Sequence, residues 1–438
     1  MKKLNKRIAI FICVVMVIGT LPVYAFAENT TYVCGDYQYI ICDSDKALAC
    51  LTKYNGTDED LVIPETFDGY SVYAIGSEAF SNSKVKSVYI PDTVKVIKDF
   101  GFFGCSELSQ VRFPKDLGSI GEHAFYWNNK IEHLEITAAW IYNGAFSGMS
   151  NLKSVVLHNT IAIKENAFSN DSLLESVVFD TKSLQEIGNN AFNSCSALKS
   201  IYIDSYSSTR LKLGEYAFCN CYYLEDVYIN QIDRLSLGAF QYCQRLKSFR
   251  VNKLYSNIDE SAFDWCYSLR ELDFGYVYAP LNPDSYTNTS SVFTQRYLRR
   301  IESHALETGS TVTEKIVIPR GFGYLGSCVC CKDIWLPDTI YAIADDAISD
   351  TTVIHGYSGT YAQQYAENNG IEFQPIIFGD TDEDDDVTLS DYAFIKAVVS
   401  EQQNTITPYQ RLVSDINGDT SIDSFDMFRV DKAVNGLN

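Results

Sequence analysis

Positive charge is scarce in this sequence: 35 Lys and Arg stand against 56 Asp and Glu in 438 residues. The resulting net charge of −21 repels phosphate backbones and anionic headgroups, which argues against nucleic acid and anionic membranes as partners. Long apolar runs are also scarce. One covers residues 8–18, and no later stretch is long enough to span a bilayer.

The residue patterns of common catalytic and zinc sites are missing as well. The five His are scattered, and the 13 Cys include neither two well-spaced pairs nor a pair with His, as zinc requires. Residues 321–326, GFGYLG, have the letters of a dinucleotide fingerprint, but too few residues follow for its helix. Residues 356–359, GYSG, lack the spacing of a nucleophile elbow. The sequence therefore predicts a protein that is not an enzyme.

The first 27 residues have the layout of a secretory signal peptide. Four basic residues precede the apolar run 8–18, and Ala25-Phe26-Ala27 provides a small-x-small cleavage site. A retained membrane anchor is the alternative, but the run is short and is followed by Gly19 and Pro22. We expect cleavage and secretion, which leaves 31 Lys and Arg against 56 Asp and Glu and no membrane span.

Most of the remaining chain consists of repeats of one short pattern, for example residues 187–203, IGNNAFNSCSALKSIYI. Its phenylalanine recurs 21 to 26 residues apart at Phe80, Phe102, Phe125, Phe146, Phe168, Phe192, Phe218, Phe240 and Phe263. A fixed period in this range predicts a solenoid. Within one repeat, Leu198, Ile201 and Ile203 predict a short strand, and Ala191-Phe192 predicts a single helical or 3₁₀ turn.

This pattern resembles the BspA-type leucine-rich repeat family over about residues 69–373. The resemblance implies an α/β repeat solenoid that binds other molecules and supplies no active site. Residues 28–68 are expected to cap the array at its N-terminal end, because an open end would expose the core. Residues 275–300, rich in Tyr, are either a decayed repeat or a projecting binding loop.

The cysteines fall into two groups. Five occupy one repeat position, Cys105, Cys195, Cys221, Cys243 and Cys266, where Asn128, Met149 and Asp171 stand in other repeats. We interpret them as a buried ladder of small apolar thiols. Six others lie near the two ends of the array: Cys34, Cys42, Cys50, Cys328, Cys330 and Cys331. Export permits disulfides among these six, but the sequence does not fix their pairing.

The strands also predict a binding face. The residue between the last two inward positions of each strand points to solvent, and this outward column reads Tyr89, Arg112, Glu135, Val156, Val178, Tyr202, Tyr228, Arg250 and Asp273. Tyr and Arg are favoured anchors in interfaces. The candidate ligand contacts are therefore Tyr89, Arg112, Tyr202, Tyr228 and Arg250, with an ordinary strand surface as the alternative. The ligand is an unidentified protein or glycan.

After a short linker at residues 374–378, two acidic loops of twelve residues begin 35 residues apart. Oxygen-bearing side chains at positions 1, 3, 5 and 12 suit Ca²⁺. The candidate ligands are Asp380, Asp382, Asp384, Asp386 and Asp391 in the first loop, and Asp415, Asn417, Asp419, Ser421 and Asp426 in the second. Position 6, which favours a positive φ and usually holds Gly, is Asp385 or Thr420. Helices are expected at 392–399 and 427–434.

The duplicated loop and helix resemble a type I dockerin domain over residues 379–438. The resemblance implies an all-α unit with two Ca²⁺ sites that docks to a cohesin domain on a scaffold protein. The contacts it implies are Leu389, Ser390, Lys396, Ser424, Phe425 and Lys432. Packing is expected through Phe394, Ile395, Val398, Phe428 and Val430. Without Ca²⁺ the whole unit is expected to unfold, because its core is too small to resist the crowded carboxylates.

The combination predicts a secreted, non-catalytic binding protein, tethered to a cellulosome-like scaffold involved in polysaccharide degradation. Two other functions stay open. One is a cell-surface adhesin for host or neighbouring-cell proteins. The other is a glycoside hydrolase subunit, because many chains with a dockerin act on polysaccharides; release of sugar from plant polysaccharides would identify it.

Overall fold

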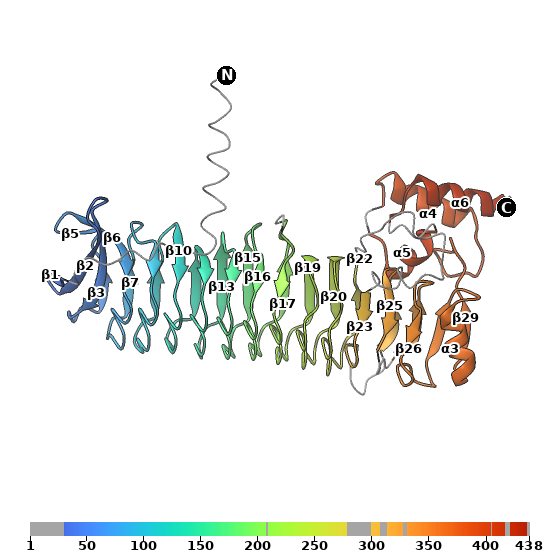
Figure 1. Cartoon of the computed structure of the whole chain (residues 1–438), viewed down its shortest axis with the longest axis horizontal. Coiled ribbons are helices and arrows are strands. Elements are labelled where there is room, and N and C mark those ends of the chain that lie inside the picture. Colours follow the sequence, from blue (N-terminus) through green and yellow to red (C-terminus); the bar gives the residue numbers. More distant parts are fainter. Residues whose placement is uncertain are drawn as a thin grey trace, which may run out of the picture.

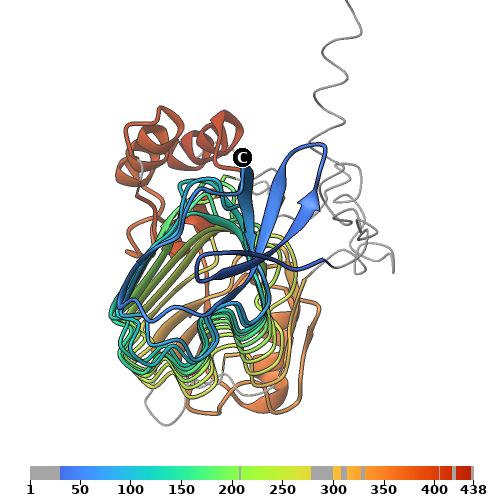
Figure 2. The same cartoon turned by 90° about the vertical axis from the view of Figure 1, so that its left-hand side faces the viewer.

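The computed structural model describes residues 30–206, 209–277, 299–306, 313–326, 331–403, 405–416 and 421–435. It is an elongated β-solenoid of about 13 turns, with a group of helices on one side of its C-terminal end (Figure 1). Figure 2 shows the successive turns nearly superimposed along the long axis. The predicted repeat solenoid is confirmed. The predicted signal peptide lies outside the described residues. Among the helices that are described, none has the length and hydrophobicity that a membrane span requires.

The predicted outward column lies on one face of the solenoid, which we call the long-strand face. Its strands are β4 (Asp60–Val62), β7 (Ser87–Tyr89), β9 (Gln110–Arg112), β11 (His133–Ile136), β13 (Ser154–His158), β15 (Ser176–Asp180), β17 (Ser200–Ile203), β19 (Asp226–Ile232), β20 (Ser248–Leu254), β21 (Glu271–Asp273), β24 (Thr313–Val317), β26 (Cys331–Leu336), β28 (Val353–Gly356) and β29 (Phe373–Pro375). The register is constant, so Tyr202 pairs with Tyr228 and Tyr228 pairs with Arg250. Ile201 and Ile203 are buried on either side of the exposed Tyr202, as period-two alternation requires.

The strands of the second face are mostly shorter, with two to four residues each apart from the first. They are β6 (Tyr70–Ile75), β8 (Val96–Ile97), β10 (Leu117–Ile120), β12 (Ala138–Ile141), β14 (Ala162–Ile163), β16 (Glu186–Ile187), β18 (Lys212–Leu213), β22 (Tyr276–Val277), β23 (Arg299–Ile301), β25 (Phe322–Leu325) and β27 (Ala342–Ile343). At the N-terminal end, β1 (Tyr32–Cys34), β2 (Tyr37–Asp43) and β3 (Leu48–Tyr54) pair antiparallel, and β5 (Thr66–Phe67) pairs with β6. Strand β3 then pairs with β6 in parallel, so the antiparallel strands cover the first turn of the array.

The core between the two faces contains a continuous stack of the repeated phenylalanine rings. From Phe80 to Phe263, neighbouring ring centroids are 4.7 to 5.9 Å apart and their planes lie within 11° of each other. Single turns with i to i+3 hydrogen bonds hold the rings, as where Cys195 N donates to Phe192 O at 3.2 Å. No α-helix forms at this step in the described repeats. One repeat alone would expose its ring, so stability depends on stacking.

The five repeat cysteines form the predicted buried ladder. Each thiol donates to the carbonyl of the phenylalanine one repeat earlier; Cys195, for example, bonds Phe168 O at 3.1 Å. Asp171, which replaces a cysteine, is fully buried, and burial raises its pKa well above the usual carboxyl value. Of the six cysteines whose disulfide pairing the sequence does not fix, Cys328 and Cys330 lie outside the described residues. Cys42 and Cys50 lie on the paired strands β2 and β3.

Four helices are described beyond the strands of the array: α3 (Tyr361–Asn369), α4 (Leu389–Val399), α5 (Pro408–Ser414) and α6 (Ser424–Val434). Helix α3 buries Ala362, Tyr365 and Ala366 against the last turns and ends at Gly370, whose φ is 69°. Residues 374–378, predicted as a linker, are not a free connection. Strand β29 extends to Pro375 and pairs with β28, and Ile376 is buried.

Candidate functional site

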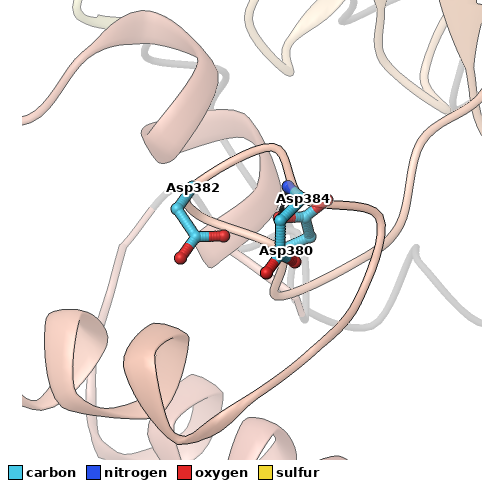
Figure 3. Close-up of side chains that lie close together, drawn as sticks. All are labelled: Asp380, Asp382 and Asp384. Carbon is cyan, nitrogen blue, oxygen red and sulfur yellow. Dashed lines mark hydrogen bonds between the residues drawn. The ribbon is translucent and has the colours of Figure 1, made fainter.

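The first acidic loop brings three of its predicted calcium ligands together. Carboxylate oxygens of Asp380, Asp382 and Asp384 lie within 4.8 Å of one another (Figure 3). Backbone amides fold the loop around Asp380, whose carboxylate accepts from Glu383 N at 2.8 Å and from Asp385 N at 3.1 Å. Oxygens at this separation fit around one ion with Ca–O distances of about 2.3–2.6 Å. The donor set is therefore suited to a hard cation such as Ca²⁺.

Position 6 of this loop has the backbone that the sequence predicts. Asp385 has a φ of 69°, the left-handed conformation that glycine adopts at this position in related loops. Asp tolerates this conformation better than most residues do. Thr420, the equivalent residue of the second loop, lies outside the described residues.

Asp391 at position 12 is held apart from the cluster of three carboxylates. Its oxygens accept from Thr381 N at 2.6 Å and Thr388 N at 2.8 Å, and from both hydroxyls. Burial acts to raise its pKa, but the bonds from Thr388 and Thr381 outweigh burial and lower it. For Asp380 burial prevails over the loop amides and raises the pKa. Asp391 therefore stays ionised and also caps α4, as the third residue of a capping box with Thr388.

The second loop repeats this arrangement where it is described. The carboxylate of Asp426 is fully buried and accepts from Ile416 N at 2.8 Å and Asp423 N at 3.0 Å, matching the bonds of Asp391. Asp423 and Asp426 form the capping box of α6. Asp415 is buried, Ser421 is exposed, and Asn417 and Asp419 lie outside the described residues. The two loops thus share one local design.

Both predicted helices are present, and each begins three residues earlier than expected, at Leu389 and Ser424. They pack on each other and each buries one apolar residue fully, Ile395 in α4 and Val430 in α6. Phe394 and Val398 are half-buried, and Phe428, expected in this core, is 55% exposed. The prediction for Phe428 was wrong, because it lies two residues before Val430, about 200° around the helix, so the two side chains cannot face the same core.

The predicted cohesin contacts lie on the surface of this unit. Leu389 is 71% exposed and Phe425 is 49% exposed, both in the first turn of a helix, and Lys432 is half-buried. Ser390, Lys396 and Ser424 are exposed. The position equivalent to Phe425 in the first copy is Ser390, so the two copies present different side chains.

Helix α5 was not predicted. It packs against the array, where Tyr409, Leu412 and Val413 join Val317, Trp335, Tyr357, Ile376 and Phe378 in a hydrophobic cluster separate from the main core. We call this set the α5 cluster. A sequence signal for the helix was present, because Thr407 and Gln410 form a capping box and Pro408 occupies the first helical position.

The outward column keeps the register that the sequence predicts, but its members differ in their exposure and in their side-chain partners. Tyr202 is 63% exposed and stacks on Tyr228, with ring centroids 4.9 Å apart. Arg112 lies over Tyr89 at 4.4 Å. The guanidinium of Arg250 bonds both oxygens of Glu271, at 2.6 and 2.8 Å. Asp273 accepts from Arg411 of α5 at 2.7 Å, so the column is covered from this residue onward.

Comparison with known proteins identifies both parts of the chain. The family model for the BspA type leucine rich repeat region matches residues 73–199 and 161–292, in six copies. The model for the dockerin type I domain matches residues 378–435. No curated protein matches the chain.

Several solved leucine-rich repeat structures are similar to it. A leucine-rich repeat protein from Bacteroides ovatus has 20% identity and a TM-score of 0.42, over 79% of this chain and 99% of that one. A leucine rich cell surface protein from Faecalibacterium prausnitzii has 23% identity and a TM-score of 0.36, over 78% and 98%. The pneumococcal vaccine antigen PcpA has 17% identity and a TM-score of 0.36, over 80% and 100%.

Proposed function

Because the chain belongs to the BspA-type leucine-rich repeat family and ends in a type I dockerin domain, we propose that it attaches a ligand-binding array to a cohesin-bearing scaffold. Both domains are of non-catalytic kinds that are typical of extracellular proteins, and type I dockerins typically bind calcium. In this proposal the protein is secreted, its two loops hold Ca²⁺, and the scaffold is cellulosome-like and acts in polysaccharide degradation.

The observation that carries the proposal is the arrangement of the dockerin surface. Leu389 and Phe425, near the ends of the two acidic loops, place apolar side chains in solvent, while the last loop residues, Asp391 and Asp426, are fully buried. Ca²⁺ in each loop would be held by Asp380 or Asp415 and the side chains that follow. The metal neutralises the crowded carboxylates and fixes the first turns of α4 and α6, so the apolar pair is presented in one geometry.

Changing Leu389 and Phe425 together to Asp is expected to abolish cohesin capture in calcium. Exposed apolar anchors at the centre of an interface commonly contribute 2 kcal/mol or more each, so their loss together should weaken binding by about a thousandfold. Cohesin capture on an immobilised domain measures this loss. Leu173→Asp with Tyr222→Asp, two exposed apolar residues of the array, is the matched control and should bind normally. Undiminished capture by the Leu389 and Phe425 variant would refute the proposed cohesin contacts.

The single changes identify which copy of the duplicated unit makes the contact. If the protein binds in one orientation, one of Leu389→Asp and Phe425→Asp should remove binding and the other should leave it nearly unchanged. Equal, partial losses would mean that both orientations are used.

The array provides the second binding activity, for a protein or glycan ligand. It is supported by the stack of the exposed Tyr202 on the half-buried Tyr228, beside Arg250 on the long-strand face. Aromatic rings at this exposure supply contact area with little conformational entropy to lose. An adhesin that binds host or neighbouring-cell proteins through the same face would use the same residues.

Replacing Tyr202, Tyr228 and Arg250 together by Ala should lower the affinity for a ligand found on a glycan or protein array by a hundredfold or more, since each anchor contributes about 1–2 kcal/mol. Binding is measured with the full chain. The control replaces two Tyr and one Arg on another surface, Tyr222, Tyr223 and Arg245, where Arg245 lies over the ring of Tyr223 at 4.1 Å. If both triple variants bind as the wild type does, the long-strand face is not the ligand site.

A further inference from the structure

The C-terminal end of the long-strand face is a docking surface whose occupant is α5 of the same chain. Strands β24 and β26 continue the outward column with Val317 and Trp335, and both are buried by the α5 cluster. The ring of Trp335 stacks on that of His355, with centroids 3.9 Å apart, and packs edge-to-face with the ring of Tyr409. In Figure 1, α5 lies between the array and the pair α4 and α6. The dockerin is therefore mounted on the array and does not hang from a linker.

Polar contacts surround this apolar contact and fix the orientation of α5 on the array. Tyr357 Oη donates to Leu412 O at 3.2 Å. Arg411 of α5 pairs with Asp273, and Lys315 of β24 pairs with Glu383 of the first loop at 2.6 Å. The Lys315 pair is partly exposed and contributes little, whereas the Arg411 pair is mostly buried. These polar pairs therefore allow α5 to pack in one position on the array, in addition to the apolar area that it buries.

Arg320 of the array has the most unusual position in this contact. Its side chain is 5% exposed, and its guanidinium bonds the carboxylate of Asp338 at 3.0 Å. It also donates to the backbone carbonyl of Asp415 and lies 3.7 Å from Asp415 Oδ1. The rings of Tyr357 and Phe378 lie 5.7 and 5.1 Å from it. A buried cation is stable only when paired, and here Asp415 supplies half of that pairing.

Asp415 connects this contact to the proposed calcium chemistry. It ends α5 as its C-cap residue, and it is the first residue of the second predicted calcium loop. The array therefore reaches the start of that loop through one side chain. Because Arg320 offsets the charge of Asp415, this aspartate needs no metal to remain buried and ordered.

We propose that Arg320 is a positioning residue for Asp415, which keeps α5 seated on the array without calcium and confines the calcium-dependent transition to the loops and helices α4 and α6. The inference rests on the proposed function only in taking those two helices to be calcium-dependent. It differs from the expectation that the whole dockerin unfolds in chelator. The cohesin-binding helices then fold on a fixed base, and any ligand that binds the long-strand face is restricted to the part before Asp273.

Hydrogen exchange of the full chain in calcium and in chelator tests this directly. In the wild type with chelator, amides of α5 should exchange at least about tenfold more slowly than those of α4 and α6. Arg320→Gln should speed exchange in α5 in chelator by about a hundredfold, because Asp415 is left buried without its partner. Calcium should restore much of the protection in this variant, since the metal also fixes Asp415; a purely structural defect would not respond to calcium.

Conservative variants separate positioning from general damage. Arg320→Lys keeps the charge but cannot bond Asp338 and Asp415 together, so its exchange should fall between wild type and Arg320→Gln. Tyr357→Phe removes only the hydroxyl that bonds Leu412 O, and should speed exchange in α5 about tenfold with the array intact. Arg300→Gln, at a half-buried arginine paired with Glu302, is the matched control and should leave α5 unchanged. Amides of β19 and β20 report whether the array stays folded.

The inference is overturned if α5 exchanges as fast as α4 and α6 in wild-type chelator samples, or if Arg320→Gln matches the wild type there. Absence of any calcium effect on α4 and α6 would instead refute the proposed calcium-dependent docking. In that case the protection of α5 still decides whether Arg320 positions Asp415, so the two failures are distinguishable.

Discussion

Asp380→Ala combined with Asp391→Ala is expected to abolish calcium binding in the first loop and cohesin capture with it, while the array stays folded. Asp380 belongs to the cluster of three carboxylates and organises the loop amides around itself. Asp391 holds Thr381 and Thr388 together and caps α4. Losing both removes ligand charge and loop geometry at once, so helix α4 should not form even in excess calcium.

The size of this effect follows from linkage. Calcium at a hundred times its dissociation constant contributes about 2.7 kcal/mol per site to the stability of the folded state. Loss of the cap removes about 1 kcal/mol more. The pair of helices α4 and α6, in which Ile395 and Val430 are the fully buried apolar residues, cannot lose that much and stay folded. Calcium titration should show the number of bound ions falling from two to one, and cohesin capture should fall to background.

Single changes and a matched pair complete this experiment. Asp380→Ala alone separates loss of the metal from loss of the cap, since Asp380 caps no helix. Asp345→Ala with Asp346→Ala removes two exposed aspartates of the array and should change neither calcium binding nor capture. Unchanged circular dichroism and retained capture by the wild type in chelator would contradict the calcium assignment itself.

Phe192→Ala is expected to destabilise the middle of the array by about 3–5 kcal/mol. The ring is fully buried between Phe168 and Phe218, with centroids 5.2 Å away on each side and planes parallel within 1°. Phe179 contacts it edge-on. Truncation leaves a cavity between two repeats that neighbouring backbones cannot close, because each is fixed by its own strand pairing. Hydrogen exchange in β17 and β19 measures the loss.

The damage should decay with distance from Phe192. Each repeat contacts mainly its neighbours, so the loss of protection should spread over adjacent turns and leave α5 protected at the far end. The control is Tyr202→Ala, which removes a ring of similar size from an exposed position and should change stability by about 0.5 kcal/mol or less. Equal effects of the two substitutions, or rapid exchange in α5 after Phe192→Ala, would show that the array does not behave as a chain of locally stabilised repeats.

The solenoid, the buried ladders and the local design of the acidic loops could all be predicted from the sequence. Each of these features is set within one repeat of 21 to 26 residues or one loop of twelve. Phe192 stacks on the same residue of the next repeat, and Asp391 bonds Thr381 and Thr388 of its own loop. When partners are local or periodic, the pattern of one unit specifies the contact in all of them, so sequence reasoning is sufficient.

Three features could not be predicted from the sequence: where the dockerin sits, which part of the outward column it covers, and that residues 374–378 are packed. The contact of Arg411 with Asp273 joins residues 138 apart, and that of Arg320 with Asp415 joins residues 95 apart. Neither pair belongs to a repeat, so no period marks it. In the sequence, nothing distinguishes Arg411 and Trp335 from ordinary surface residues; their contacts exist only because α5 packs against β24 and β26. The sequence encodes α5 by its capping box, but its partner depends on which apolar surface the last turns of the array leave uncovered.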